Sequence, residues 1–66
     1  MPLIHANILA GRSHAQKAAF ARAVTEAATV HLDVPAAAVR VIFHEIPPSD
    51  WFTAGEAKAP PPAGAG

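Results

Sequence analysis

The sequence predicts a small α/β domain made of one β-α-β unit. Two short runs rich in branched apolar residues, 2–9 and 39–46, have the composition of strands. The segment between them is rich in alanine, the best helix former, so we expect it to form a long helix. Strands joined in this way lie parallel, and the crossover is right-handed in about 98% of cases.

The first strand is expected over residues 2–9. Only His5 and Asn7 are polar in this run, and both occupy odd positions, which is typical of a strand with one buried face. The segment Ala10-Gly11-Arg12 interrupts this pattern, so the strand should end there.

The helix is predicted over residues 14–32. Ser13, followed three residues later by Gln16, has the spacing of a capping box and marks the beginning. Asp33-Val34-Pro35 marks the end, because the residue before a proline is pushed out of the helical region. Spacings of three, four and seven residues predict one apolar face composed of Phe20, Ala23, Val24, Ala27 and His31.

The second strand, VRVIFHEI at residues 39–46, is the clearest element in the sequence. Its alternation divides the side chains into two faces. One face holds Arg40, Ile42, His44 and Ile46, and the other holds Val39, Val41, Phe43 and Glu45. A single helix covers one face of the sheet, so the other should stay uncovered and mostly apolar, which favours assembly with other subunits.

The C-terminal part is predicted to form a turn, an arm and a tail. Pro47-Pro48-Ser49-Asp50 is the turn, and WFTAGEAKA after it forms a short hairpin or an arm that docks on a neighbour. The last residues, APPPAGAG, bury too little apolar surface to become ordered. We therefore expect a β-α-β domain over residues 1–58 and a disordered tail over residues 59–66.

Length and composition also predict a subunit of a homo-oligomer. A domain of 66 residues buries only about 60% of the surface that its unfolded chain exposes. The chain has no cysteine, which excludes disulfides and thiolate metal sites, so oligomerisation is the remaining means of stabilisation.

The charges argue against several classes of partner. Five basic residues balance five acidic ones, so we expect neither nucleic acid nor a membrane surface as a partner. The first residues lack the features of a signal peptide and no apolar run is long enough to span a membrane, so a cytoplasmic protein is expected. No cofactor is expected, and no metal either, because close ligand spacing is absent among His5, His14, His31 and His44.

Pro2 is the first candidate for chemistry. A small second residue permits removal of the initiator methionine, and Pro2 would then carry a free secondary amine. The pKa of an α-amino group is ordinarily about 8, and burial or a nearby cation lowers it. A neutral amine near pH 7 is a competent general base. The plainer reading is that Pro2 merely begins a strand.

Arg12 and Arg40 are two further candidates. Arg12 comes just after the first predicted strand, and Arg40 lies at the start of the second. A guanidinium fits a carboxylate in a bidentate manner, so these residues suit an acidic substrate. Arginine at such positions is more commonly a solvated surface residue, and Trp51 more commonly packs in a core or interface.

Three stretches together resemble the 4-oxalocrotonate tautomerase family. They are PLIHANILAGRS at 2–13, DVPAAAVRVIFHEI at 33–46 and PPSDWFTAGE at 47–56, and the resemblance extends over residues 2–58. It implies a tautomerase fold in which two subunits pair into a four-stranded sheet. It also implies a homo-oligomer, most often a hexamer built as a trimer of dimers.

The same resemblance implies roles for four residues. Pro2 would be the general base in keto–enol tautomerisation of a small 2-oxo or 2-hydroxydienoate acid. Arg12 and Arg40 would bind and polarise the oxygens of this carboxylate substrate, and Trp51 would form the apolar wall of the site.

Two features depart from the family pattern. Ala10 stands where the family often has an acidic residue, and Thr53-Ala54-Gly55 replaces a glycine-rich turn. Two alternatives to a tautomerase therefore stay open. Related enzymes dehalogenate haloacrylates or hydrate acetylenic acids with a carboxylate beside the proline, for which Asp50 is the only nearby candidate. The other alternative is a non-catalytic oligomeric module.

Overall fold

The computed structural model describes residues 1–61 and confirms the β-α-β unit. Strand β1, Leu3–Leu9, leads to helix α1, His14–Leu32, and the chain returns through strand β2, Arg40–Ile46. The two strands pair in parallel, from Leu3 opposite Arg40 to Leu9 opposite Ile46. Residues 62–66 of the predicted tail lie outside the described residues, and the division at residue 58 stays a prediction.

Helix α1 begins and ends where the sequence predicts. The Ser13 hydroxyl accepts a hydrogen bond from the Gln16 amide at 3.1 Å, while the Gln16 side chain accepts one from the Ser13 amide at 3.0 Å. This reciprocal pair satisfies two N–H groups that the first turn leaves without helical partners. Asp33 ends the helix in the left-handed region with φ of 55°.

The predicted apolar face of the helix is wrong at Ala23, Ala27 and His31, which are exposed. Val24 is half-buried, and Phe20, although 52% of its surface is accessible, has its ring 6.1 Å from the ring of Phe43 on the covered face of the sheet. Small side chains let the helix approach the strands, so most of the contact is made by alanines. The face against the sheet comprises Lys17, Ala18, Ala21, Val24, Thr25, Ala28 and Thr29.

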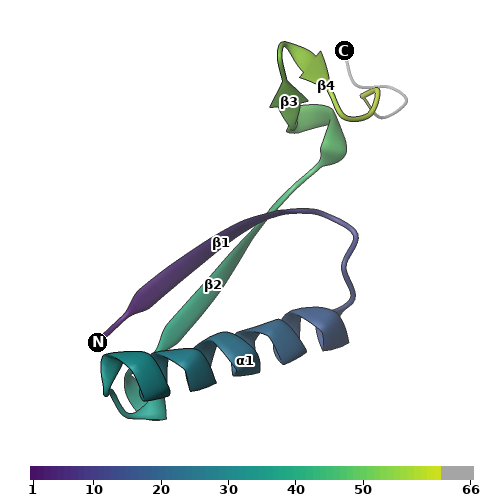
Figure 1. Ribbon diagram of the computed structural model, residues 1–66. Helices are drawn as coiled ribbons and strands as arrows, with labels where there is room; N and C mark the ends of the chain where they lie inside the picture. The colour runs from purple at the N-terminus through teal and green to yellow at the C-terminus, as the bar shows by residue number, and fades with distance from the viewer. Residues whose placement is uncertain (62–66) are drawn as a thin grey trace.

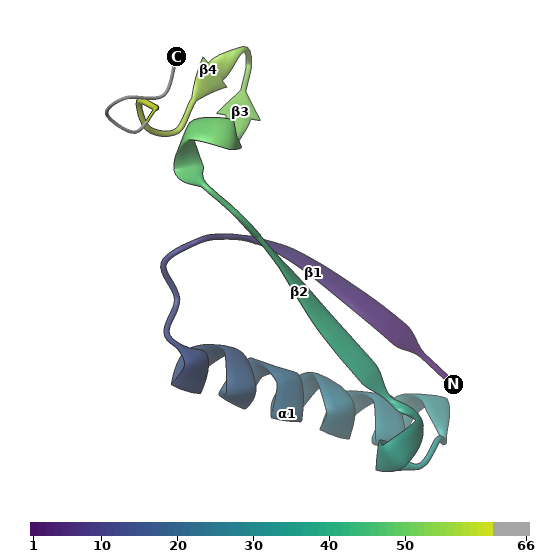
Figure 2. The ribbon, with the colours of Figure 1, turned by 180° about the vertical axis from the view of Figure 1, so that it is seen from behind.

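Helix α1 covers only one face of the sheet (Figures 1 and 2). The covered face is half-buried and comprises Ile4, Ala6, Ile8, Val41 and Phe43. An ion pair of 3.1 Å between Lys17 and Glu45 joins the helix to β2 on this side. The uncovered face alternates apolar and polar side chains, and it comprises Leu3, His5, Asn7, Leu9, Arg40, Ile42, His44 and Ile46.

The C-terminal arm is a two-stranded hairpin that stands away from the β-α-β unit (Figure 1). Strand β3, Phe52–Thr53, pairs antiparallel with β4, Glu56–Ala57. Ala54 and Gly55 make the turn with positive φ values of 53° and 82°. The radius of gyration is 15.6 Å. A compact domain of this length would have about 11 Å, so the arm makes the subunit elongated.

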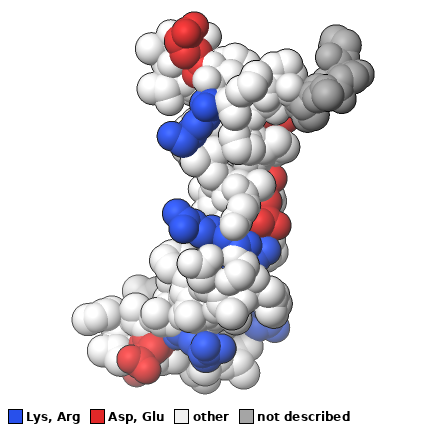
Figure 3. Space-filling view, turned by 90° about the vertical axis from the view of Figure 1, so that its right-hand side faces the viewer, with Lys and Arg blue, Asp and Glu red and all other residues white. Residues whose placement is uncertain are grey.

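The isolated subunit has almost no core. Within residues 1–61, Ala28 is the only buried apolar residue, with 7% of its surface accessible. Leu3, Ile42 and Phe52 stay exposed, the first two on the uncovered face and the third on the arm. On the face in Figure 3, acidic and basic side chains are interspersed along the length of the molecule. No helix in the described part is long and apolar enough to cross a membrane.

Candidate functional site

Pro2 and Arg40 lie side by side at the beginning of the two strands. The Arg40 amide donates a hydrogen bond to the Pro2 carbonyl at 3.0 Å, one step before the Leu3–Arg40 pair of the sheet. The parallel register therefore places the backbone of Pro2, which would carry the amine, next to that of Arg40, one of the two candidate cations.

The Arg40 side chain is held by the turn that precedes β2. Its Nη1 donates to the carbonyl oxygen of Ala37 at 2.6 Å, and Ala37 lies in a 3-10 turn over Ala36–Ala38. A guanidinium has five N–H donors in a fixed plane, so this bond leaves donors for an anionic ligand. The 3-10 turn thus holds the Arg40 guanidinium at the beginning of β2.

Pro2 itself is half-buried, and Met1 precedes it with 86% of its surface exposed. While Met1 is attached, the Pro2 nitrogen is part of an amide and has no basic lone pair. Removal of the exposed Met1 turns this nitrogen into a secondary amine, which can take up a proton.

Arg12 lies at the opposite end of β1. The seven residues of the strand separate the two ends by about 20 Å at the usual rise per residue. Gly11 has φ of 126°, which side chains disfavour, and this conformation turns the chain from β1 toward α1. One described subunit therefore does not bring Arg12 to Pro2.

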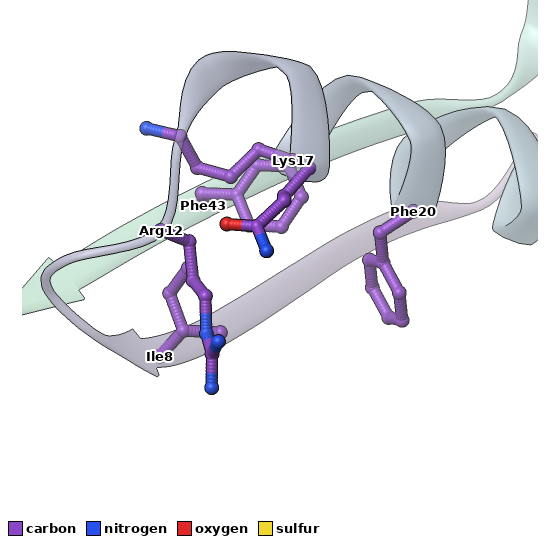
Figure 4. A pocket seen from close by; sticks show the side chains of 6 residues that line it. Ile8, Arg12, Lys17, Phe20 and Phe43 are labelled. Atoms are coloured by element: carbon purple, nitrogen blue, oxygen red, sulfur yellow. The ribbon is translucent and has the colours of Figure 1, made fainter.

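Arg12 borders a hollow of about 280 Å³ between the sheet and the first turns of α1. Figure 4 shows Arg12 and Phe20 on either side of this space. The Phe20 ring lies 6.1 Å from the Phe43 ring, with the two planes tilted by 55°. The lining is mainly apolar and comprises Ile8, Arg12, Gln16, Lys17, Phe20 and Phe43.

Trp51 also lies away from Pro2, where the chain leaves β2 for the arm. It is half-buried, and its carbonyl accepts a hydrogen bond from the Lys58 amide at 2.8 Å, which closes the base of the hairpin. The four residues predicted for the site thus fall into two groups within a subunit. Pro2 and Arg40 lie at one end of the sheet, and Arg12 and Trp51 follow its other end.

His5 and His44 form a pair that the sequence interpretation missed. Nδ1 of His5 lies 2.8 Å from Nε2 of His44, and the two rings stack with centroids 5.0 Å apart. The alternation of side chains along the two strands could have indicated that His5 and His44 lie on one face. It does not indicate the register that makes the two residues neighbours. Among residues 1–61, no group of three or more His, Cys, Asp or Glu side chains is placed to hold a metal.

Comparison with known proteins identifies similar chains. The family model described as "Tautomerase enzyme" matches residues 2–59. The chain is 43% identical over 56 residues to 2-hydroxymuconate tautomerase of Stutzerimonas stutzeri, with 85% of this chain and 89% of the relative covered.

Two solved structures have the same fold. TomN, a 4-oxalocrotonate tautomerase homologue in the tomaymycin biosynthetic pathway, superposes with a TM-score of 0.83 at 46% identity, covering 86% of this chain and 88% of TomN. A heterohexameric 4-oxalocrotonate tautomerase from Chloroflexus aurantiacus superposes with a TM-score of 0.83 at 45% identity, covering 88% of this chain and 94% of the other.

Proposed function

Because this chain belongs to the tautomerase family and is an isomerase, we propose that it catalyses keto–enol tautomerisation of small 2-oxo acids with Pro2 as the general base. The observation that carries the proposal is the hydrogen bond of 3.0 Å between the Arg40 amide and the Pro2 carbonyl. It supports a site in which a base and a cation lie next to one another.

The proposed reaction needs two proton transfers, one from the substrate to Pro2 and one from Pro2 back to the substrate. The neutral Pro2 amine takes the proton from the hydroxyl group of a 2-hydroxydienoate, and the electrons of the O–H bond form the C2 carbonyl. The double bond shifts and the protonated amine returns a proton to carbon, so the substrate is isomerised without gain or loss of atoms. Arg40 stabilises the charge that develops on the C2 oxygen.

We propose that Arg12 and Trp51 reach this site from neighbouring subunits. Their position beyond the far ends of β1 and β2 supports this division, because a second subunit can bring them to Pro2. Arg12 would bind the substrate carboxylate in a bidentate manner, and Trp51 would exclude water from the amine.

The proposed assembly is a homo-oligomer in which two β-α-β units pair into a four-stranded sheet, with a hexamer as the expected state. Three observations support it: the single buried residue, the exposed Leu3 and Ile42 on the uncovered face, and the arm that stands apart. A heterohexameric relative at 45% identity agrees with this state.

The proposal assigns the activity to residues 1–58 and none to the tail. Its test is the ketonisation of phenylenolpyruvate by protein whose mass shows the loss of Met1. Retention of Met1 in an assembled but inactive protein would instead favour the non-catalytic module, because the Pro2 nitrogen would then stay an amide.

A further inference from the structure

The His5–His44 pair can hold only one proton between its facing nitrogens. Nδ1 of His5 and Nε2 of His44 are 2.8 Å apart, so one nitrogen donates its hydrogen and the other accepts it with a lone pair. The pair therefore exists with both rings neutral or with one ring charged. When both rings are protonated, two N–H groups face each other and the hydrogen bond is lost.

Among the residues that the structure describes, the surroundings of the pair add positive charge and no negative charge. On the uncovered face of this described part, Arg40, opposite Leu3 in the register, is the one other ionisable side chain. The acidic residue nearest in sequence, Glu45, points to the opposite face, where it pairs with Lys17 of α1 at 3.1 Å. Full protonation would thus leave three cations on this face, and none of them would have a carboxylate partner there.

The same face carries exposed apolar side chains that other copies of the chain would cover in the proposed hexamer. Leu3 and Ile42, with 57% and 43% of their surfaces exposed, flank the histidine pair, and the pair satisfies its facing nitrogens within one subunit. This arrangement suits another copy of the same face more than a charged partner. In a symmetric homo-oligomer each copy contributes the same patch, so any charge on it is repeated in every copy.

We propose that the His5–His44 pair makes the assembly of this chain sensitive to acid, with protonation of both rings driving the subunits apart. The inference rests on the homo-oligomer of the proposed function and not on its catalytic step. Histidine ordinarily changes its charge between about pH 5 and pH 8, which is the interval to examine. Because the dissociated subunits bind more protons than the assembly, the dissociation constant rises as the pH falls, by up to about tenfold per pH unit for each proton taken up.

The test is sedimentation velocity of the full chain at fixed concentration, at a series of values from about pH 8 to about pH 5. The wild type is compared with His5→Gln and His44→Gln, because a neutral amide keeps a hydrogen-bonding side chain at either position. His31→Gln is the matched control, since His31 lies exposed in the last turn of α1, away from the uncovered face. Far-UV circular dichroism at each pH shows that the subunits stay folded.

The expected result is that the wild type and His31→Gln dissociate on acidification, with a rise in the dissociation constant of at least about tenfold. The two pair variants should show a clearly smaller rise. The inference is overturned by a wild-type assembly that is unchanged at about pH 5. Pair variants that dissociate as the wild type does, or a wild type that is monomeric at every pH, also overturn it. Because the readout is mass, a loss of tautomerase activity alone would contradict the proposed function and leave this inference standing.

A proton NMR titration of the wild-type imidazoles provides an independent reading. The signals of His5 and His44 should change over the same pH interval as the dissociation. Dissociation in a different interval would contradict the role of the pair, even if the variants failed to fold.

Discussion

The amide of Arg40 donates a hydrogen bond to the carbonyl of Pro2 at 3.0 Å, which places the beginning of one strand against the beginning of the other. The Arg40 backbone is thereby adjacent to the residue whose nitrogen removal of Met1 would free. The Arg40 guanidinium is in turn oriented by the Ala37 carbonyl. The backbone register therefore brings together, within a single subunit, the two residues proposed as cation and base.

Replacing Arg40 should weaken catalysis more than binding. We expect Arg40→Ala to lower kcat by about 10²-fold to 10³-fold, because the charge on the C2 oxygen loses its stabilising donor. Steady-state kinetics with phenylenolpyruvate measure this effect. Arg22→Ala is the control, since Arg22 lies exposed on α1, and it should leave kcat unchanged. An equal effect of both substitutions would contradict a specific role for Arg40.

Sharing of the site between subunits predicts complementation. Pro2→Ala and Arg12→Ala proteins should each have little activity, yet a mixed assembly should recover it. At equal amounts, about a quarter of the sites would combine an intact Pro2 with an intact Arg12 from a neighbour. The two proteins are unfolded together, refolded together and assayed, with each refolded alone as the control. No recovery in assemblies shown by native mass spectrometry to be mixed would indicate that both residues act within one chain.

Water-adding chemistry should be weak. The dehalogenase alternative requires a carboxylate next to Pro2, but Asp50 lies in the 3-10 turn Pro48–Asp50, beyond the opposite end of β2 in the same chain. We expect halide release from 3-haloacrylates to be at least about 10²-fold slower than ketonisation, because Asp50 is exposed in its turn and the arm offers Thr53 rather than an acid. An ion-selective electrode measures this release, and comparable rates would support the dehalogenase alternative.

The capping box should contribute measurably to stability. Ser13→Ala removes the acceptor of the Gln16 amide, and we expect a loss of about 1 kcal/mol in the free energy of unfolding. Urea unfolding at a fixed protein concentration measures it, because the stability of an oligomer depends on concentration. Ser13→Thr keeps the hydroxyl and should retain most of the stability. Equal losses for both variants would indicate that the hydroxyl makes no contribution.

The elements of the fold were predictable because their signals are local. The Ser13 and Gln16 spacing, the residue before Pro35 and the branched residues of the second strand each act within a few residues. The inward face of α1 was not predictable in the same way. A helix rich in alanine has little contrast between its faces, so Ala23, Ala27 and His31 were assigned to the inward face although they are exposed.

The arrangement of the site depended on information that the sequence does not contain. The register of β1 with β2 determines that Pro2 meets Arg40 and that His5 meets His44, and a shift of one residue would separate both pairs. The family pattern supplied candidate roles for Arg12 and Trp51. How these residues reach Pro2 depends on surfaces of other subunits, so their roles stay predictions.

The most direct test is the rate of phenylenolpyruvate ketonisation by wild type and Pro2→Ala, with the loss or retention of Met1 in each protein determined by intact mass. We expect a loss of about 10²-fold to 10⁴-fold for Pro2→Ala, because the secondary amine held in the proline ring is replaced by a less restrained primary amine, with the same sedimentation coefficient for both proteins. An active wild type that retains Met1, or a Pro2→Ala protein with full activity, would contradict the role of Pro2 as the general base.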